Sequence, residues 1–222
     1  FGYTVWLRPQ DAYLGRGVAA SGPLATRLGL SGVPVIAETI ALHTLIELVR
    51  STGTRVHLSR LSSAAGVALV RRARDEGLPL SCDVSIHSLH LIDTDIGYFD
   101  SRARLDPPLR QQRDRAALRE ALADGTIDAL VSDHNATHMD AKTLPFGEAD
   151  VGATAVELLL SQALKWGQES GAGLLRALAV VTAEPGRVLA AGATPMGGQP
   201  GRLQEGGAAD VCVFDPDARW TV

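Results

Sequence analysis

The sequence predicts an α/β fold with a parallel β-sheet, either a (β/α)8 barrel or an open doubly wound sheet. Three observations support this prediction. Strand, loop and helix patterns recur about every 25 to 45 residues, a period typical of parallel strands joined by right-handed crossovers. Residues 127–131 form an apolar run with the length of a strand buried on both faces. With 222 residues, 45% hydrophobic and 21% charged, the chain can bury a large core.

Four strands are expected to form the sheet. Residues 3–7 are rich in β-branched and aromatic side chains, and residues 55–61 begin by alternating apolar and polar side chains. Residues 80–86 form the third expected strand. The fourth, residues 127–131, ends on Ser132-Asp133-His134. A carboxylate and an imidazole at the C-terminal end of a buried strand lie where α/β enzymes place their chemistry.

The helices are expected between these strands and after the last of them. Apolar residues at helical spacing indicate a helix over residues 35–50, in which His43 is expected to be a packing or surface residue. The same criterion, with Gly and Pro marking the ends, predicts helices at residues 64–76, 116–123, 154–167 and 174–181, and a short one opened by Pro185.

One segment is long and irregular. Residues 93–115 contain Pro107-Pro108, which forces an extended backbone, and a cluster of arginines. Such a length within a compact domain is typical of a functional loop.

The composition excludes some classes of partner. A formal charge of −4 and a pI near 5.9 give no basic surface for nucleic acid, so a small molecule or another protein is the expected partner. No apolar run approaches the length of a membrane span, and no signal peptide is visible, which predicts a cytoplasmic protein. Cys82 and Cys212 lack metal-ligand spacing and indicate a reducing compartment, with a lone disulfide as the alternative. The chain begins within an expected strand, without Met, and is interpreted as part of something longer.

Polar side chains follow the expected strands. The carboxyl ends of the strands in a parallel barrel face one way, so these residues are expected to lie together at that end of the barrel. Carboxylates and imidazoles gathered there suit a divalent metal such as zinc. The residues concerned are Asp11, Arg60, His87, His90, Asp133 and His134.

Each residue also has a purely structural interpretation. Asp11 can cap the turn at residues 12–14, Asp133 can cap the turn that follows it, and a single histidine is more often a surface residue than a ligand. No glycine-rich phosphate loop follows a strand and no Gly-x-Ser-x-Gly motif is present, which argues against nucleotide binding and serine hydrolysis.

Several motifs together resemble one family over almost the whole chain. It is the amidohydrolase superfamily and, within it, the dihydroorotases of the beta-proteobacterial-like type. The motifs are Gly29-Leu-Ser-Gly-Val-Pro34 with Ala37-Glu38, His57-Leu-Ser-Arg-Leu-Ser-Ser63, Asp106-Pro-Pro-Leu-Arg110, Asp124-Gly-Thr-Ile-Asp128 leading into Ser132-Asp-His134, Lys142, Pro145-Phe146, and Gly206-Gly-Ala-Ala-Asp210.

The resemblance implies a metal-dependent (β/α)8 barrel that reversibly cyclises N-carbamoyl-L-aspartate to L-dihydroorotate in pyrimidine biosynthesis. Residues 1–195 are expected to be the C-terminal part of the barrel. Residues 196–222, with a strand at 209–215, are expected to return to a small flanking β-domain.

The resemblance also implies roles for residues of the site. Asp133 matches the aspartate that carries the proton, while a metal-bound hydroxide attacks the ring amide. Asp11, His87 and Asp133 match metal ligands, and one zinc ion is expected. Substrate binding is assigned to Arg60, His90, His134 and His138.

The sequence departs from the family at the first metal site. It contains no His-x-His pair, and Arg60 stands where relatives carry a ligand histidine. A guanidinium remains protonated and cannot ligate zinc, so a second metal ion is not expected. Thr137 also replaces a histidine that relatives often carry, and His138 lies one position later.

These departures leave three functions open. The first is an active dihydroorotase with a reduced metal site. The second is a non-catalytic homologue that serves as a scaffold for aspartate transcarbamoylase. The third is another cyclic amidase, such as a hydantoinase or allantoinase. A homo-oligomer is expected in each case.

Overall fold

The computed structural model describes residues 2–191, 201, 205, 207 and 209–218. Its main sheet is parallel and has the order β1-β4-β5-β6, formed by Val5–Leu7, Val56–Leu58, Leu80–Ser85 and Ala129–Val131. Val5 lies opposite Val56, Val56 opposite Leu80, and Asp83 opposite Ala129. Consecutive strands of the main sheet are therefore neighbours, as the strand–helix period predicts.

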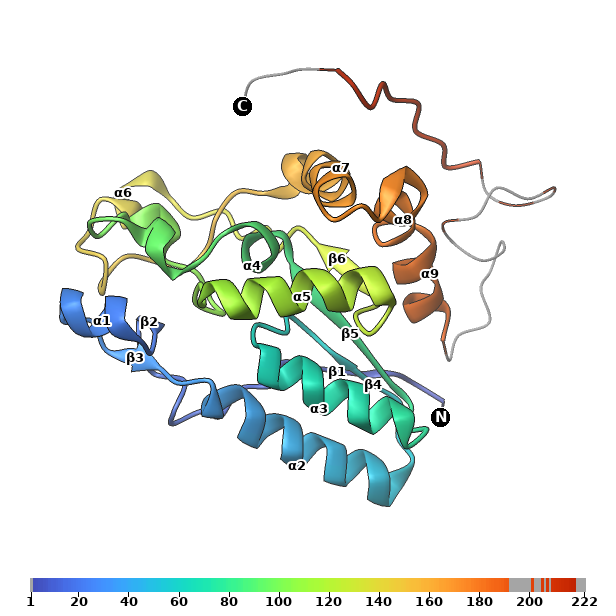
Figure 1. The fold of residues 1–222 in the computed structure, drawn as a ribbon, viewed down its shortest axis with the longest axis horizontal. Coiled ribbons are helices and arrows are strands. Elements are labelled where there is room, and N and C mark those ends of the chain that lie inside the picture. The colour runs from blue at the N-terminus through green and yellow to red at the C-terminus, as the bar shows by residue number, and fades with distance from the viewer. Residues whose placement is uncertain (1, 192–200, 202–204, 206, 208, 219–222) are drawn as a thin grey trace.

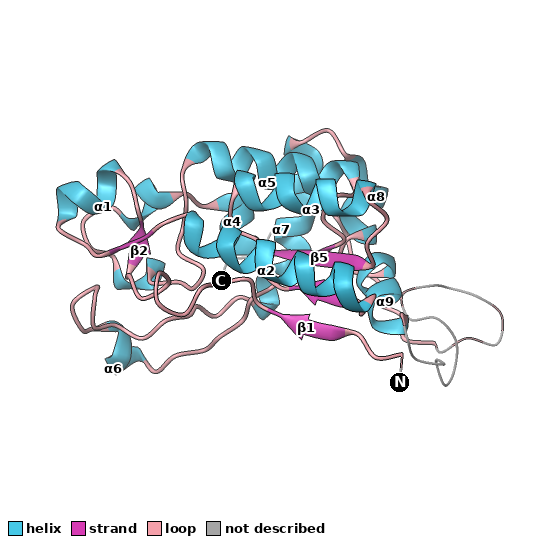
Figure 2. Cartoon of the chain, turned by 90° about the horizontal axis from the view of Figure 1, so that it is seen from below, coloured by secondary structure: helices cyan, strands magenta, loops and turns pink. Residues whose placement is uncertain are grey.

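Helices join these strands and cover one face of the sheet (Figures 1 and 2). They are α2 (Ile36–Thr52), α3 (Ala64–Asp75) and α5 (Gln112–Asp124). The main core lies between them and the strands, and its fully buried side chains include Leu42, Leu58, Val70, Val84 and Leu122.

After β6, the chain forms α7 (Leu159–Glu169), α8 (Gly173–Ala179) and α9 (Ala183–Ala190). A 3-10 turn, η3 (Val156–Leu158), precedes α7. The backbone amide of Leu130 donates to the carbonyl of Val180 at 2.9 Å, which ties β6 to the end of α8. The part of the chain that the structure describes has no helix long and apolar enough to cross a membrane.

Smaller elements gather at the end of the molecule opposite the N-terminus (Figure 1). They are α1 (Pro23–Leu28), α6 (Met139–Lys142) and the two-residue strands β2 (Ala19–Ala20) and β3 (Gly32–Val33). A second apolar cluster, which includes Leu24, Ile96, Leu109 and Phe146, holds these elements against the loop after β5. That loop contains α4 (Ile86–His90), η1 (Asp93–Ile96) and η2 (Ser101–Ala103).

Some predicted boundaries were wrong for local reasons. β4 ends at Leu58 instead of residue 61, because Arg60 adopts a left-handed backbone with φ 59°. α5 begins at Gln112 instead of residue 116, and its buried Asp114 accepts a hydrogen bond from the amide of Ala64 at 3.0 Å. The pair β2–β3 was not predicted, since two-residue strands show no periodicity.

The C-terminal prediction is wrong in one respect. Residues 209–215 form no strand and are exposed, and a strand requires a hydrogen-bonded neighbour that the described residues do not supply. Residues 192–200 and most of 202–208 lie outside the described residues, so the division at residue 196 stays a prediction.

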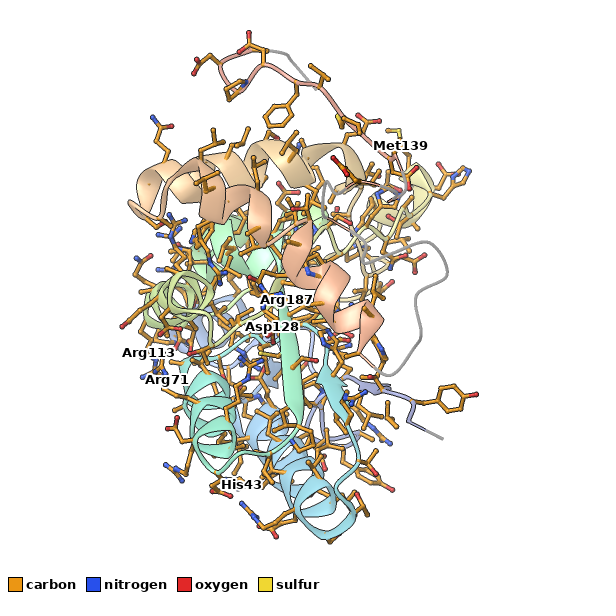
Figure 3. The ribbon with its side chains drawn as sticks, turned by 90° about the vertical axis from the view of Figure 1, so that its right-hand side faces the viewer. His43, Arg71, Arg113, Asp128, Met139 and Arg187 are labelled. Carbon is orange, nitrogen blue, oxygen red and sulfur yellow. The ribbon has the colours of Figure 1, made fainter. Side chains whose placement is uncertain are left out.

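His43 is exposed on α2, as expected for a packing or surface residue. Figure 3 shows it far from Met139 of α6. Ile36 and Ile40 of the same helix are 50% and 40% exposed, so part of the apolar pattern of α2 is not buried by the described chain.

Candidate active site

The centre of the candidate site is an ion pair between two strand ends. Arg60 follows β4 and Asp133 follows β6, and the two strands lie on either side of β5. Nη1 of Arg60 donates to Oδ1 of Asp133 at 2.9 Å and to the carbonyl oxygen of Asp106 at 3.0 Å. The structure therefore brings together Asp133 and Arg60, two of the predicted site residues.

Both partners of this ion pair have left-handed backbones. The φ angles are 59° for Arg60 and 49° for Asp133, a region that costs energy for residues other than glycine. Such strain persists only where the surroundings impose it, and it concentrates at functional sites. Here the two strained residues meet, which makes these strand ends the candidate site.

A buried hydrogen-bond chain imposes the conformation of Arg60. Oδ1 of Asp83 accepts the backbone amide of Arg60 at 2.7 Å, and its Oδ2 contacts Nε2 of His57 at 2.9 Å. Nδ1 of His57 in turn lies 2.7 Å from Oγ of Ser81. His57 and Asp83 are almost fully buried on neighbouring strands, so they hold the loop after β4 without facing the pocket themselves.

A pocket of about 270 Å³ opens beside the ion pair. Arg60 and Asp133 are 31% and 14% exposed there. The carboxylate of Asp106 accepts two hydrogen bonds from the guanidinium of Arg8. The lining residues are Arg60, Leu105, Asp106, Asp133, Asn135, Val151 and Gly152. The pocket thus has two carboxylates, each paired with an arginine.

His87 is the predicted ligand that remains available. It lies in α4, directly after β5, and its buried Nε2 has no hydrogen-bond partner within the described residues. Burial lowers the pKa of His87 below its usual 6.5, while the charge and backbone of nearby Asp133 oppose this shift. The imidazole is therefore neutral near pH 7, the form that can ligate a metal or accept a proton.

Asp11 has a different local role. Its Oδ1 accepts the backbone amides of Tyr13 at 2.9 Å and Leu14 at 2.8 Å, so it caps the turn that follows. This geometry matches the structural interpretation of Asp11, and its role as a metal ligand stays a prediction.

The described donor residues do not by themselves form a zinc site. A catalytic zinc site normally uses three protein ligands and one open position. Among residues 2–191 and the other described positions, no three His, Cys, Asp or Glu side chains are placed to hold one ion. His87 and Asp133 lie near each other, but Asp133 is bound to the guanidinium of Arg60.

Two of the predicted substrate-binding histidines do not line this pocket. Nδ1 of His134 accepts the amides of Ala155 at 3.0 Å and Val156 at 3.2 Å, so this side chain fixes the start of η3. The side chain of His138 is 86% exposed, with Nδ1 3.7 Å from a carboxylate oxygen of Asp140. Their assignment to substrate stays a prediction without support from these contacts.

His90 lines a second pocket, of about 520 Å³, between α5 and α7. Its Nε2 lies 3.0 Å from the carbonyl oxygen of Gln162. Burial lowers the pKa of His90 to about 4, with smaller contributions from the charges of Arg119 and Lys165, while the Gln162 contact and Glu169 oppose the shift. The structure therefore separates His90 from the pocket that Asp133 lines.

The lowered pKa of His90 predicts a pH dependence of stability. An unfolded histidine titrates near 6.5, and the folded one titrates near 4. Between these values the unfolded chain binds a proton that the folded chain does not, so acidification favours unfolding. Both chains should lose free energy of unfolding when the pH falls from neutral to about 4.5. We expect this loss to be about 1 kcal/mol smaller in His90→Gln than in the wild type, a figure that allows for the partial exposure of His90. Urea unfolding at several pH values measures this; equal losses in both chains would contradict it.

Comparisons with known protein sequences identify relatives of this chain. No family model matches the sequence. A dihydroorotase-like protein of Pseudomonas aeruginosa is 41% identical over 217 residues, which make up 97% of this chain and 50% of that protein. A dihydroorotase of Anaeromyxobacter dehalogenans is 38% identical over 225 residues, covering 100% of this chain and 50% of that protein. This chain is a homologue of the dihydroorotases. It spans about half the length of these curated relatives.

Solved structures of amidohydrolases share the fold. A D-hydantoinase structure has a TM-score of 0.75 and 22% identity, covering 93% of this chain and 46% of that one. Dihydroorotase from Saccharomyces cerevisiae has a TM-score of 0.66 and 15% identity, covering 81% of this chain and 48% of that one. The predicted barrel fold is confirmed, and the dihydroorotase homologue described here corresponds to part of such a barrel.

Sequence reasoning missed several residues of the site. Asp106 and Asn135 line the pocket, and Asp83 holds Arg60, although none was named as a site residue. Asp106 stands in the motif Asp-Pro-Pro-Leu-Arg, and Asn135 directly follows His134, so proximity to motifs was an available signal. Asp83 lies within a strand, where a carboxylate is costly to bury unless it is paired.

Proposed function

We propose that the protein is a dihydroorotase-like cyclic amide hydrolase that interconverts L-dihydroorotate and N-carbamoyl-L-aspartate. The observation that carries the proposal is Asp133, which lines a pocket at the carboxyl end of β6 in a homologue of the dihydroorotases. A cytoplasmic location, a homo-oligomeric state and a place in pyrimidine biosynthesis belong to the same proposal.

Two side chains have the chemistry that the reaction requires. The carboxylate of Asp133, held beside a guanidinium, accepts a proton from the attacking water and returns it to the ring nitrogen as the amide bond breaks. Nη2 and Nε of Arg60 donate no hydrogen bond to any described residue, so they are available to orient a carbonyl or carboxylate of the substrate. No step is assigned to zinc, because the described residues do not fit it.

The test is an assay of both directions with the full chain. We expect dihydroorotate to be hydrolysed and carbamoyl-aspartate to be cyclised. The absorbance of the dihydropyrimidine ring measures the rate of both reactions. A hydantoin and allantoin, assayed in parallel, distinguish the other cyclic amidases. The complete absence of turnover, with and without added zinc, would overturn the enzymatic proposal.

A second candidate function is a non-catalytic scaffold for aspartate transcarbamoylase. The ion pair between Arg60 and Asp133 favours it, because the carboxylate is already engaged by a side chain that cannot ligate a metal. Its test is co-purification. If the protein is a scaffold, it should form a complex with aspartate transcarbamoylase at micromolar concentrations, and separate elution of the two proteins would exclude the scaffold.

A further inference from the structure

We infer that Arg60 is a built-in cation that takes the place of a divalent metal ion beside Asp133, so that the site is organised without metal. The inference concerns the identity of the cation at the strand ends. It therefore applies equally to a catalytic protein and to a scaffold, and it is tested by metal binding instead of turnover.

Three contacts fix the position of Arg60. Asp83 accepts its backbone amide at 2.7 Å, while the carbonyl of Asp106 and the carboxylate of Asp133 accept its Nη1 at 3.0 and 2.9 Å. These acceptors come from the loops after β5 and β6 and from β5 itself. A surface ion pair between two mobile side chains lacks such anchors, so the guanidinium is a fixed part of the site.

The charges around the pocket balance without an added ion. Asp133 is paired with Arg60, and Asp106 is paired with Arg8. A divalent cation at Asp133 would have to displace one guanidinium or lie within a few ångströms of it. Charges of like sign at such a distance repel strongly in a partly buried site. Binding of a metal ion by the wild-type chain is therefore opposed by a charge that the chain itself carries.

The nearby donor atoms show what one substitution would change. Nε2 of His87 is buried and has no hydrogen-bond partner among the described residues. Burial lowers the pKa of His87 and the charge of Asp133 opposes this shift, which places the two side chains near each other. These two side chains supply one nitrogen and one carboxylate, one ligand short of the usual catalytic zinc set. The substitution Arg60→His would remove the repelling charge and add the third donor.

The experiment compares zinc binding by the full chain after treatment with a chelator. Zinc chloride is titrated calorimetrically into the wild type, Arg60→His, Arg60→Gln and the double variant Arg60→His/Asp133→Asn, and bound zinc is counted by elemental analysis. We expect stoichiometric zinc, about one ion per chain, only in Arg60→His. Arg60→Gln removes the charge without adding a ligand, and the double variant removes a ligand, so both are expected to bind far less zinc.

Two results would overturn the inference. One is a wild-type chain that takes up stoichiometric zinc while Arg60 is still in place. The other is an Arg60→His chain that melts cooperatively and still binds no zinc. If Arg60→His fails to fold, the wild-type titration alone decides, because stoichiometric zinc there is incompatible with a built-in cation. If the wild-type chain does not turn over dihydroorotate, the proposed enzymatic function is refuted. The outcome of the zinc measurements does not depend on that result.

Discussion

Replacing Asp133 with asparagine is expected to lower dihydroorotate turnover at least about 100-fold, the usual contribution of a positioned proton carrier. An amide at this position cannot accept a proton near neutral pH. The loss should appear in kcat more than in KM, because the carboxylate acts on the reacting atoms. Steady-state rates in both directions measure the effect.

The same substitution should leave the fold intact. Asp133 has φ 49°, and asparagine is among the few residues that adopt this conformation readily. The carbonyl oxygen of an asparagine can still accept a hydrogen bond from Arg60. The side chain of Arg60 is 31% exposed, so water can solvate the charge that loses its partner. Lost activity in the variant would therefore not reflect unfolding, which a melting curve verifies.

Asp140→Asn is the matched control. It removes the same charge from a nearby aspartate whose side chain is 95% exposed on α6 and does not line the pocket. We expect its turnover to stay within about twofold of the wild type. Activity of Asp133→Asn within a few-fold of the wild type would show that another group carries the proton.

The strand ends were predictable, but the direction of their side chains was not. Period and burial patterns located β1, β4, β5 and β6 to within a few residues. They could not reveal that residues 60 and 133 have left-handed backbones, because neither is glycine and the conformation is imposed by tertiary contacts. The ion pair of Arg60 and Asp133 follows from these two angles and from the position of Asp83.

The structure separates two histidines that the sequence placed together. His87 and His90 are three residues apart in a short helix after β5, yet the first lies near Asp133 and the second lines a pocket between α5 and α7. Sequence position at a strand end places both in the same region. α4 packs against α5 and α7, and His90, its last residue, lines the pocket between these two helices. Strand periodicity does not encode this packing.

A second large effect is expected at Glu38, which the sequence indicated only as part of a motif. Glu38 is 4% exposed in the first turn of α2. Its carboxylate accepts the amides of Ser62 and Ser63 at 2.8 and 3.1 Å and both of their hydroxyl groups at 2.5 Å. Arg110, also buried, donates to Oγ of Ser62 at 2.8 Å. Glu38 therefore fixes the loop that carries Arg60.

Removal of this carboxylate should destabilise the protein strongly. Glu38→Ala leaves two amides and two hydroxyls without their acceptor. It also removes a negative charge that stabilises the buried guanidinium of Arg110. Together these changes predict a loss of about 3–5 kcal/mol in the free energy of unfolding. Glu38→Gln keeps the shape and one acceptor oxygen, so a smaller loss of about 2 kcal/mol is expected. Urea unfolding of the full chain measures both losses.

Two further variants separate this network from a general effect on α2. Glu47→Ala changes a glutamate of the same helix whose side chain is 72% exposed, and it should alter stability by no more than about 0.5 kcal/mol. Gly66→Ala tests the same network from α3, because a Cβ there would lie 2.2 Å from Oε1 of Glu38. It should therefore destabilise the wild type more than it destabilises Glu38→Ala, where the clash is absent. Equal effects of Gly66→Ala in the two backgrounds would show that the carboxylate does not occupy this position.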